Sequence, residues 1–359
     1  MTSRKYNFGA GPATMPTEVL LEVQEELLDW NGMGISVMEI SHRSPEFTKI
    51  AEEAESDFRD LLSIPENYAV LFTHGGASLQ NAMIPLNLSK QGIVQYVDSG
   101  YWASRSIKEA SKFCEVGIAA SSKDKDYSYF PSQESWQIDK TANYIHITPN
   151  ETIGGVAMRS FNDTTIPLVA DFSSSILSEN LDVSKFGLIY GGAQKNIGPS
   201  GLGFVILNKD LIGHAMDGTP SMLDYQVINE GKSMFNTPPT FPWYVAGKVF
   251  KWLKSLGGVN EISKINVRKA NKLYEFIDNS DFYSNNIQKD SRSIMNIPFL
   301  LRNEDLNESF LQNSKEAGLL ALKGHRSVGG MRASIYNALP EEAIDTLIEF
   351  MSSFEKKAG

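Results

Sequence analysis

The sequence predicts an α/β protein: a large domain with a mostly parallel sheet covered by helices, and a smaller α+β domain. Short apolar runs bounded by glycine and polar residues alternate with helical patterns between residues 68 and 207. A turn-forming stretch at 236–239 then precedes two long helical patterns and a mixed remainder. The length of 359 residues allows two domains. We assign 16–263 to the large domain, and 1–15 with 264–359 to the small domain.

Two helices are expected before the first strand. Pro16 opens a segment whose apolar residues repeat at helical spacing, and Gly32 can close it. Ser44 can cap a second helix, Pro45 fits its first turn, and its apolar face extends to Leu62.

The apolar runs that follow are predicted to be strands, at 68–73, 93–97, 113–118, 143–148, 166–170, 188–190 and 203–207. Helical patterns follow Ser78 and begin at Trp102, as expected for a parallel sheet with crossover helices. The polar and aromatic stretch 121–137 is predicted to be a surface excursion. After the turn-forming stretch we expect two long helices, over 242–256 and 259–277. The smaller α+β unit that follows should contain helices over 306–317 and 340–356 and strands over 293–301 and 330–335.

Composition excludes several classes of function. The chain has 33 basic and 43 acidic residues, a net charge of −10, and no basic run that could neutralise a nucleic-acid backbone. It shows no signal-peptide pattern and no stretch near the about 18 apolar residues of a membrane helix, so we expect a cytoplasmic protein without a nucleic-acid or membrane partner. The single cysteine, Cys114, excludes an intrachain disulfide and a multi-cysteine metal site. We expect no metal, and we expect Cys114 to be a buried residue of a strand.

The strongest functional signal is Lys195, in the run Gly191-Gly192-Ala193-Gln194-Lys195-Asn196 directly after a predicted strand. Another predicted strand ends at Asp171. Pyridoxal phosphate (PLP) chemistry needs both groups, an amine to form a Schiff base and an acid to keep the pyridine nitrogen protonated. The alternative is a solvated lysine and an acid that forms a turn.

Other polar groups also follow predicted strands. Gly75-Gly76-Ala77-Ser78 could hold a phosphate on backbone amides at a helix N-terminus, although a tight turn would have the same sequence. Trp102 could stack on a flat ring or belong to the core, and the Thr152 hydroxyl could bind a ring substituent or cap a turn. Because ligands collect at the carboxyl edge of a parallel sheet, we expect these groups to share one site with Asp171 and Lys195.

Histidines and arginines gather in two places, His42-Arg43 and His325-Arg326 with Arg332 nearby. The guanidinium group matches carboxylate and phosphate, so these clusters indicate a small substrate with two anionic groups. Solvated surface charge is the alternative.

Taken together, these motifs closely resemble the phosphoserine aminotransferase family, part of the class V, fold-type I PLP-dependent aminotransferases. The resemblance extends over nearly the whole chain, from residues 7–13 to residues 329–337, and its most distinctive motifs lie at 192–199, 235–239 and 324–326. It implies the PLP-dependent transferase fold of type I with a seven-stranded-type sheet. It also implies reversible transfer of an amino group between glutamate and 3-phosphohydroxypyruvate, in serine biosynthesis. In some members of the family the activity extends to 4-phosphohydroxy-L-threonine formation in vitamin B6 synthesis.

Carried over by position, the resemblance makes Lys195 the Schiff-base lysine, Asp171 the partner of the ring nitrogen and Trp102 the stacking residue. Further cofactor contacts are implied for Ala77, Ser78, Thr152, Gln194, Asn236 and Thr237. The last two match residues that reach the cofactor of the neighbouring subunit, which implies a homodimer with active sites at its interface. Substrate binding is implied for His42, Arg43, His325, Arg326 and Arg332.

Ser78 stands where some members of the family carry an arginine that assists in binding the substrate phosphate. Two other classes compete with a transaminase. A cysteine desulfurase of the same fold needs a mobile nucleophilic cysteine, for which Cys114 is poorly placed. A regulatory PLP-binding domain would have no use for the basic substrate groups.

Overall fold

A seven-stranded sheet forms the centre of the larger part of the protein in the computed structural model, which describes residues 4–358. The strands, in their order across the sheet, are β2 (Tyr68–His74), β10 (Leu202–Asn208), β9 (Leu188–Gly192), β8 (Leu168–Asp171), β5 (Ile145–Ile147), β3 (Ile93–Asp98) and β4 (Glu115–Ser121). β10 is antiparallel to both of its neighbours, and the pairs from β9 to β4 are all parallel. The predicted mostly parallel sheet is confirmed.

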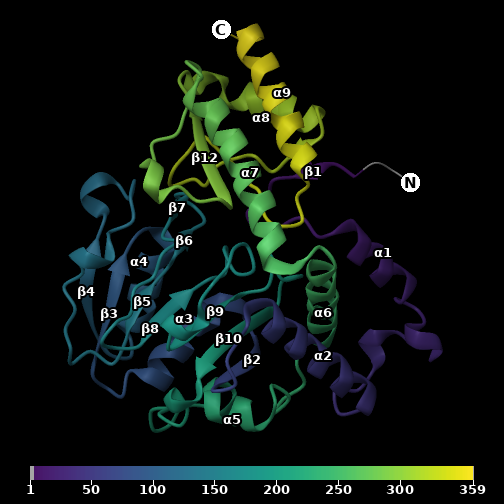
Figure 1. The fold of residues 1–359 in the computed structure, drawn as a ribbon, viewed down its shortest axis with the longest axis vertical. Coiled ribbons are helices and arrows are strands. Elements are labelled where there is room, and N and C mark those ends of the chain that lie inside the picture. Colours follow the sequence, from purple (N-terminus) through teal and green to yellow (C-terminus); the bar gives the residue numbers. More distant parts are fainter. Residues whose placement is uncertain (1–3, 359) are drawn as a thin grey trace.

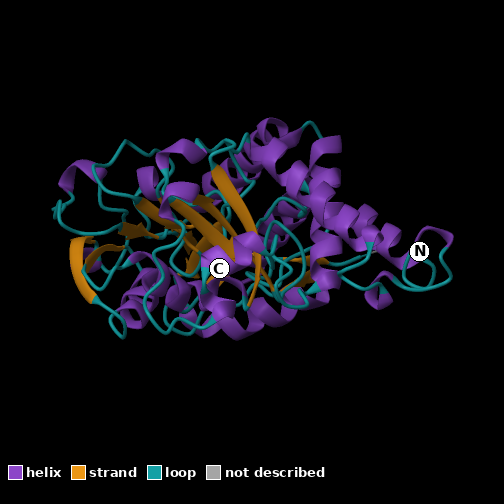
Figure 2. Cartoon of the chain, turned by 90° about the horizontal axis from the view of Figure 1, so that it is seen from below, coloured by secondary structure: helices purple, strands orange, loops and turns teal. Residues whose placement is uncertain are grey.

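Helices cover both faces of this sheet (Figures 1 and 2). One face packs on α2 (Pro45–Leu62) and α6 (Thr240–Ser255), and the other on α3 (Gly76–Leu88), α4 (Tyr101–Ala110) and α5 (Tyr225–Glu230). Successive strand residues point to opposite faces, so Phe204 joins the α2–α6 core while Val205 joins the core beneath α3. This alternation explains why the strands are apolar at almost every position.

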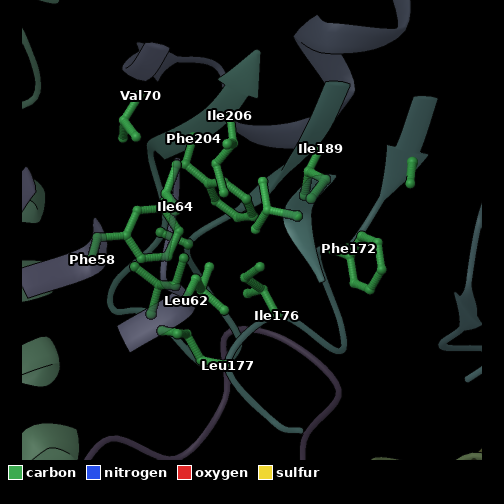
Figure 3. Packing of buried hydrophobic residues seen from close by; sticks show 14 of the residues in the cluster. Phe58, Leu62, Ile64, Val70, Phe172, Ile176, Leu177, Ile189, Phe204 and Ile206 are labelled. Carbon is green, nitrogen blue, oxygen red and sulfur yellow. The ribbon is translucent and has the colours of Figure 1, made fainter. Parts of the chain in front are cut away.

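Aromatic packing anchors α2 to the sheet (Figure 3). The Phe58 ring is fully buried, stacks on Phe250 of α6 with centroids 4.9 Å apart, and meets Phe204 of β10 edge-on at 5.5 Å. The helix begins as predicted, because the Ser44 hydroxyl accepts a hydrogen bond from the Phe47 amide and Pro45 occupies the first turn.

The smaller part of the chain has its own apolar core beside an antiparallel sheet of β11 (Tyr283–Ser284), β12 (Asn296–Leu301) and β14 (Met331–Ser334). The helices α7 (Gly258–Asp278), α8 (Asn307–Glu316) and α9 (Glu341–Ala358) pack here, at the top of Figure 1. Two small sheets complete the fold, β1 (Tyr6–Asn7) with β13 (Leu319–Leu320), and β6 (Asn150–Glu151) with β7 (Val156–Ala157). Our proposed domain boundary at residue 263 lies within α7, which contributes Ile262 to the first core and Leu273 to the second.

Two element predictions were wrong. The first helix, α1, ends at Glu25 rather than near Gly32, and the following turns leave Leu28 85% exposed, so no packing extends the helix. Cys114 does not lie in a strand: it precedes β4 by one residue, is half-buried, and donates to the Ala110 carbonyl at 3.5 Å. Burial raises the pKa of its thiol. None of the helices within residues 4–358 is long and apolar enough to cross a membrane.

Candidate active site

A cavity of about 750 Å³ opens at the carboxyl edge of the sheet. Nine of the predicted site residues contribute to its wall: Ala77, Ser78, Trp102, Thr152, Asp171, Gln194, Lys195, His325 and Arg332. They lie at the end of β8, in the segments that follow β2, β3, β6 and β9, in β14 of the smaller part and in the loop before it. The expectation that the strand ends share one site is therefore confirmed.

Lys195 follows β9 in a tight turn, in which its amide donates to the Ala193 carbonyl at 2.7 Å. Its Nζ donates a hydrogen bond to the Thr152 hydroxyl at 2.7 Å. Burial lowers the pKa of this amine to about 8, with Asp171 opposing the shift and the Arg332 charge adding to it. A fraction of the Lys195 side chain is thus neutral, and nucleophilic, near neutral pH.

Asp171 is the last residue of β8. Its carboxylate accepts hydrogen bonds from the Ser173 amide at 2.9 Å and the Ser173 hydroxyl at 2.5 Å, and that hydroxyl accepts from the Gly192 amide at 3.1 Å. Ser173 therefore joins the end of β8 to the end of β9, just before Lys195. Burial raises the pKa of Asp171, while the Ser173 bonds and the Lys195 charge act against the increase.

The loop after β2 leads directly into α3, whose first turn faces the cavity. Gly75 and Gly76 have φ angles of 74° and 56°, which favour glycine, and a Cβ at Gly75 would lie 2.8 Å from the Leu79 Cβ. The motif forms the tight turn that one interpretation expected, and this turn presents the first-turn amides of α3 to the cavity. Those amides have no partner within the helix and suit an anion.

Trp102 stands in the first turn of α4, with its ring centroid 6.0 Å from the Lys195 Nζ. The indole Nε1 is buried and has no hydrogen-bond partner among residues 4–358. The backbone amides of Trp102 and Ala103 donate to the two carboxylate oxygens of Glu151, at 3.0 and 2.9 Å. Burial raises the pKa of this carboxylate to about 7, although both amides favour its charged form.

Arg332 reaches the cavity from β14, and its Nη1 lies 3.4 Å from the Thr152 carbonyl oxygen as a donor. Its buried Nε has no partner within the described part of the chain. The ring of His325 lies 5.3 Å from the ring of Tyr101 at the cavity wall, and its Nδ1 is 2.7 Å from the Ser327 hydroxyl. Two basic groups of the smaller part thus face the Lys195 region.

Five predicted residues do not line this cavity: His42, Arg43, Asn236, Thr237 and Arg326. Apart from His42, which is half-buried, they are exposed in the single chain. The Thr237 carbonyl oxygen lies 2.9 Å from Nε2 of His74.

Sequence reasoning missed several residues of the wall, among them Ala10, Asn81, Tyr101, Asn150, Ser173 and Ser174. It also missed Glu151, which holds the turn that carries Trp102. Glu151 stands directly before Thr152, so the available signal was an acid after a predicted strand and next to a residue predicted to belong to the site.

Comparison with known proteins gives consistent matches along the chain. The family model "Aminotransferase class-V" matches residues 5–347. A phosphoserine aminotransferase of Hahella chejuensis is 56% identical over 356 residues, which cover 99% of each chain. The solved phosphoserine aminotransferase of Bacillus circulans subsp. alkalophilus superimposes with a TM-score of 0.97 at 44% identity and 99% coverage of each chain. The PLP-bound enzyme of Trichomonas vaginalis superimposes with a TM-score of 0.93 at 36% identity, over 97% of this chain and 100% of its own.

Proposed function

The chain belongs to the class-V aminotransferase family, and from this premise we propose that it is a phosphoserine transaminase that uses PLP. It transfers an amino group between glutamate and 3-phosphohydroxypyruvate, giving O-phospho-L-serine and 2-oxoglutarate, reversibly. The observation that carries this proposal is the 56% identity to the Hahella chejuensis phosphoserine aminotransferase over 99% of both chains. We also propose a cytoplasmic location, as the sequence led us to expect.

The wall of the cavity fits PLP. It offers an amine for the aldehyde at Lys195, a carboxylate for the ring nitrogen at Asp171, and the first-turn amides of α3 for the phosphate. The volume of about 750 Å³ leaves room for an amino-acid substrate beside the cofactor. We assign ring stacking to Trp102, and the remaining contacts of this subunit to Ala77, Ser78, Thr152 and Gln194.

PLP, when bound, supplies an aldehyde carbon for amino groups and a ring that withdraws electrons from the substrate Cα. Nζ of Lys195 takes the proton from the Cα of glutamate, and in the second half-reaction it returns a proton to the Cα of the new amino acid. Its lowered pKa suits both tasks, since the amine exchanges protons near neutral pH. Asp171 keeps a proton on the ring nitrogen. Thr152 holds the free Nζ through its hydroxyl.

Arg332 is proposed to bind the substrate α-carboxylate. Arg332 lines the cavity, and its buried Nε is unpartnered among residues 4–358, so an anion bound there would satisfy the group. The distal phosphate, or the side-chain carboxylate of glutamate, is assigned to His325 and Arg326 together with His42 and Arg43.

We propose a homodimer whose active sites are shared between subunits. His42, Arg43, Asn236 and Thr237 lie outside the cavity of their own chain, where a neighbouring subunit could receive them. Exposed apolar side chains in and after α1 are candidates for such an interface: Leu20, Leu21, Leu28, Met33, Ile35 and Met38. Sedimentation of Leu28→Asp should show monomers, while Ile118→Asp, also at an exposed apolar position, should remain dimeric.

Subunit mixing tests the shared site. Lys195→Ala and Arg43→Ala are each expected to be inactive, yet an equilibrated mixture should recover about a quarter of wild-type activity, because each hybrid dimer regains one complete site. A mixture without activity would show that Arg43 serves its own subunit.

Activity is tested by incubating the protein with O-phospho-L-serine and 2-oxoglutarate and measuring glutamate. Lys195→Ala should still bind PLP but lose at least about a thousandfold in turnover, because it removes the amine that moves the Cα proton. L-Serine is the control for the phosphate requirement. Undiminished turnover in Lys195→Ala would contradict the proposal. Turnover on 3-phosphohydroxypyruvate should then be compared with turnover on the phosphorylated four-carbon hydroxy-oxo acid of vitamin B6 synthesis.

A further inference from the structure

The helix that carries Trp102 lacks a cap of its own. α4 begins at Tyr101, and its N-cap residue is Gly100, which has no side chain to accept the amides of the first turn. Trp102 and Ala103 occupy the second and third positions, whose N–H groups an N-cap side chain ordinarily binds. Both amides donate instead to Glu151, which lies 49 and 48 residues away along the chain.

Gly100 makes room for that carboxylate. A Cβ at this position would lie 2.7 Å from Cδ and 2.8 Å from Cγ of Glu151. Glu151 is 1% exposed, and it belongs to β6, which pairs with β7. The neighbouring Asn150 donates hydrogen bonds to Ser174 at 2.7 Å and Asn296 at 2.8 Å. The carboxylate is therefore held by a segment that is itself fixed on two sides.

We propose that Glu151 is a positioning residue, which caps α4 from a neighbouring strand and so holds the Trp102 indole in place for stacking on PLP. This inference rests on the proposed function. An acid also suits this location because the N-terminus of α4 carries a partial positive charge. Glu151 acts through Trp102 and is not a contact of the cofactor.

The test is a double-mutant cycle measured as PLP affinity of the apoprotein. Glu151→Gln keeps the size but turns one acceptor into an NH₂ group, which cannot accept from a backbone amide. We expect it to weaken PLP binding about tenfold, the effect of losing a helix cap, and to change binding less than about twofold in a Trp102→Ala background. Asp224→Asn is the matched control, because Asp224 caps α5 through the Gln226 amide at 2.8 Å and does not line the cavity.

Two further measurements test the role of Glu151. Amide exchange at Trp102 and Ala103 should be faster in the Glu151→Gln apoprotein than in wild type. Gly100→Ala should reproduce the loss of PLP affinity while leaving Glu151 chemically intact. An equal loss in both Trp102 backgrounds, or unchanged amide exchange, would overturn this inference and leave the proposed function standing. A wild-type protein that does not bind PLP would overturn both.

Discussion

The ionisation of Lys195 is the property that connects the structure most closely to the proposed chemistry. Burial lowers the pKa of its amine from 10.5 to about 8. At pH 7.5 about a quarter of the amine is then neutral, against roughly one part in a thousand for a lysine with its ordinary pKa. The reactive form is enriched about 200-fold.

The informative perturbation is Arg332→Gln. The positive charge of Arg332 lowers the pKa of Lys195, so its removal should move the midpoint of the titration upward. Asp171→Asn provides the opposite case. Its charge favours the protonated amine, and without that charge the midpoint should fall below that of wild type.

Competitive acetylation of the apoprotein across pH 6 to 10, followed by mass spectrometry of the Lys195 peptide, measures this midpoint. Lys49, whose side chain is 76% exposed, is the internal reference. A wild-type midpoint near 10.5, or shifts of the same sign in both variants, would refute the electrostatic account of the site.

Two predictions concern stability. Burial lowers the pKa of Lys269 to about 7 from 10.5, so the unfolded chain binds more protons between these values, and the free energy of unfolding should rise with pH across that window. Lys269→Met should make the free energy of unfolding, measured by urea titration at each pH, depend less on pH. The same dependence on pH in Lys269→Met and in wild type would contradict this prediction. Phe58→Ala should cost about 3–5 kcal/mol in chemical unfolding, because the ring is fully buried against Phe250 and Phe204, whereas a cost below about 1 kcal/mol would show a core that collapses around the cavity.

Local signals account for the parts of the fold that were predicted well. Ser44 and Pro45 set the start of α2, and the apolar runs located all seven strands of the large sheet. The direction of a strand could not be predicted in this way. The residues of β10 alternate between two buried faces, and this pattern is the same whether the strand runs parallel or antiparallel to its neighbours. The end of α1 depends on tertiary packing, which the sequence pattern does not report, and the exposed Leu28 side chain has no such packing.

The site residues, too, include some that local sequence signals predicted and some that they did not. Lys195, Trp102 and Thr152 each follow a strand and Asp171 ends one. The rule that ligands collect at the carboxyl edge of a sheet therefore predicted that these residues lie together. Glu151 escaped notice because its partners, the amides of Trp102 and Ala103, are backbone groups far away along the chain. A local sequence pattern cannot indicate a helix cap whose side chain comes from a distant part of the chain.

Lys195 is proposed to be the residue that bonds to PLP. The most direct test is to reduce the PLP-loaded protein with borohydride, digest it and map the modified peptide. We predict a single pyridoxyl-modified peptide that contains Lys195, and none from Lys195→Ala treated in parallel. A modified peptide from another part of the chain, or none from wild type, would contradict this prediction.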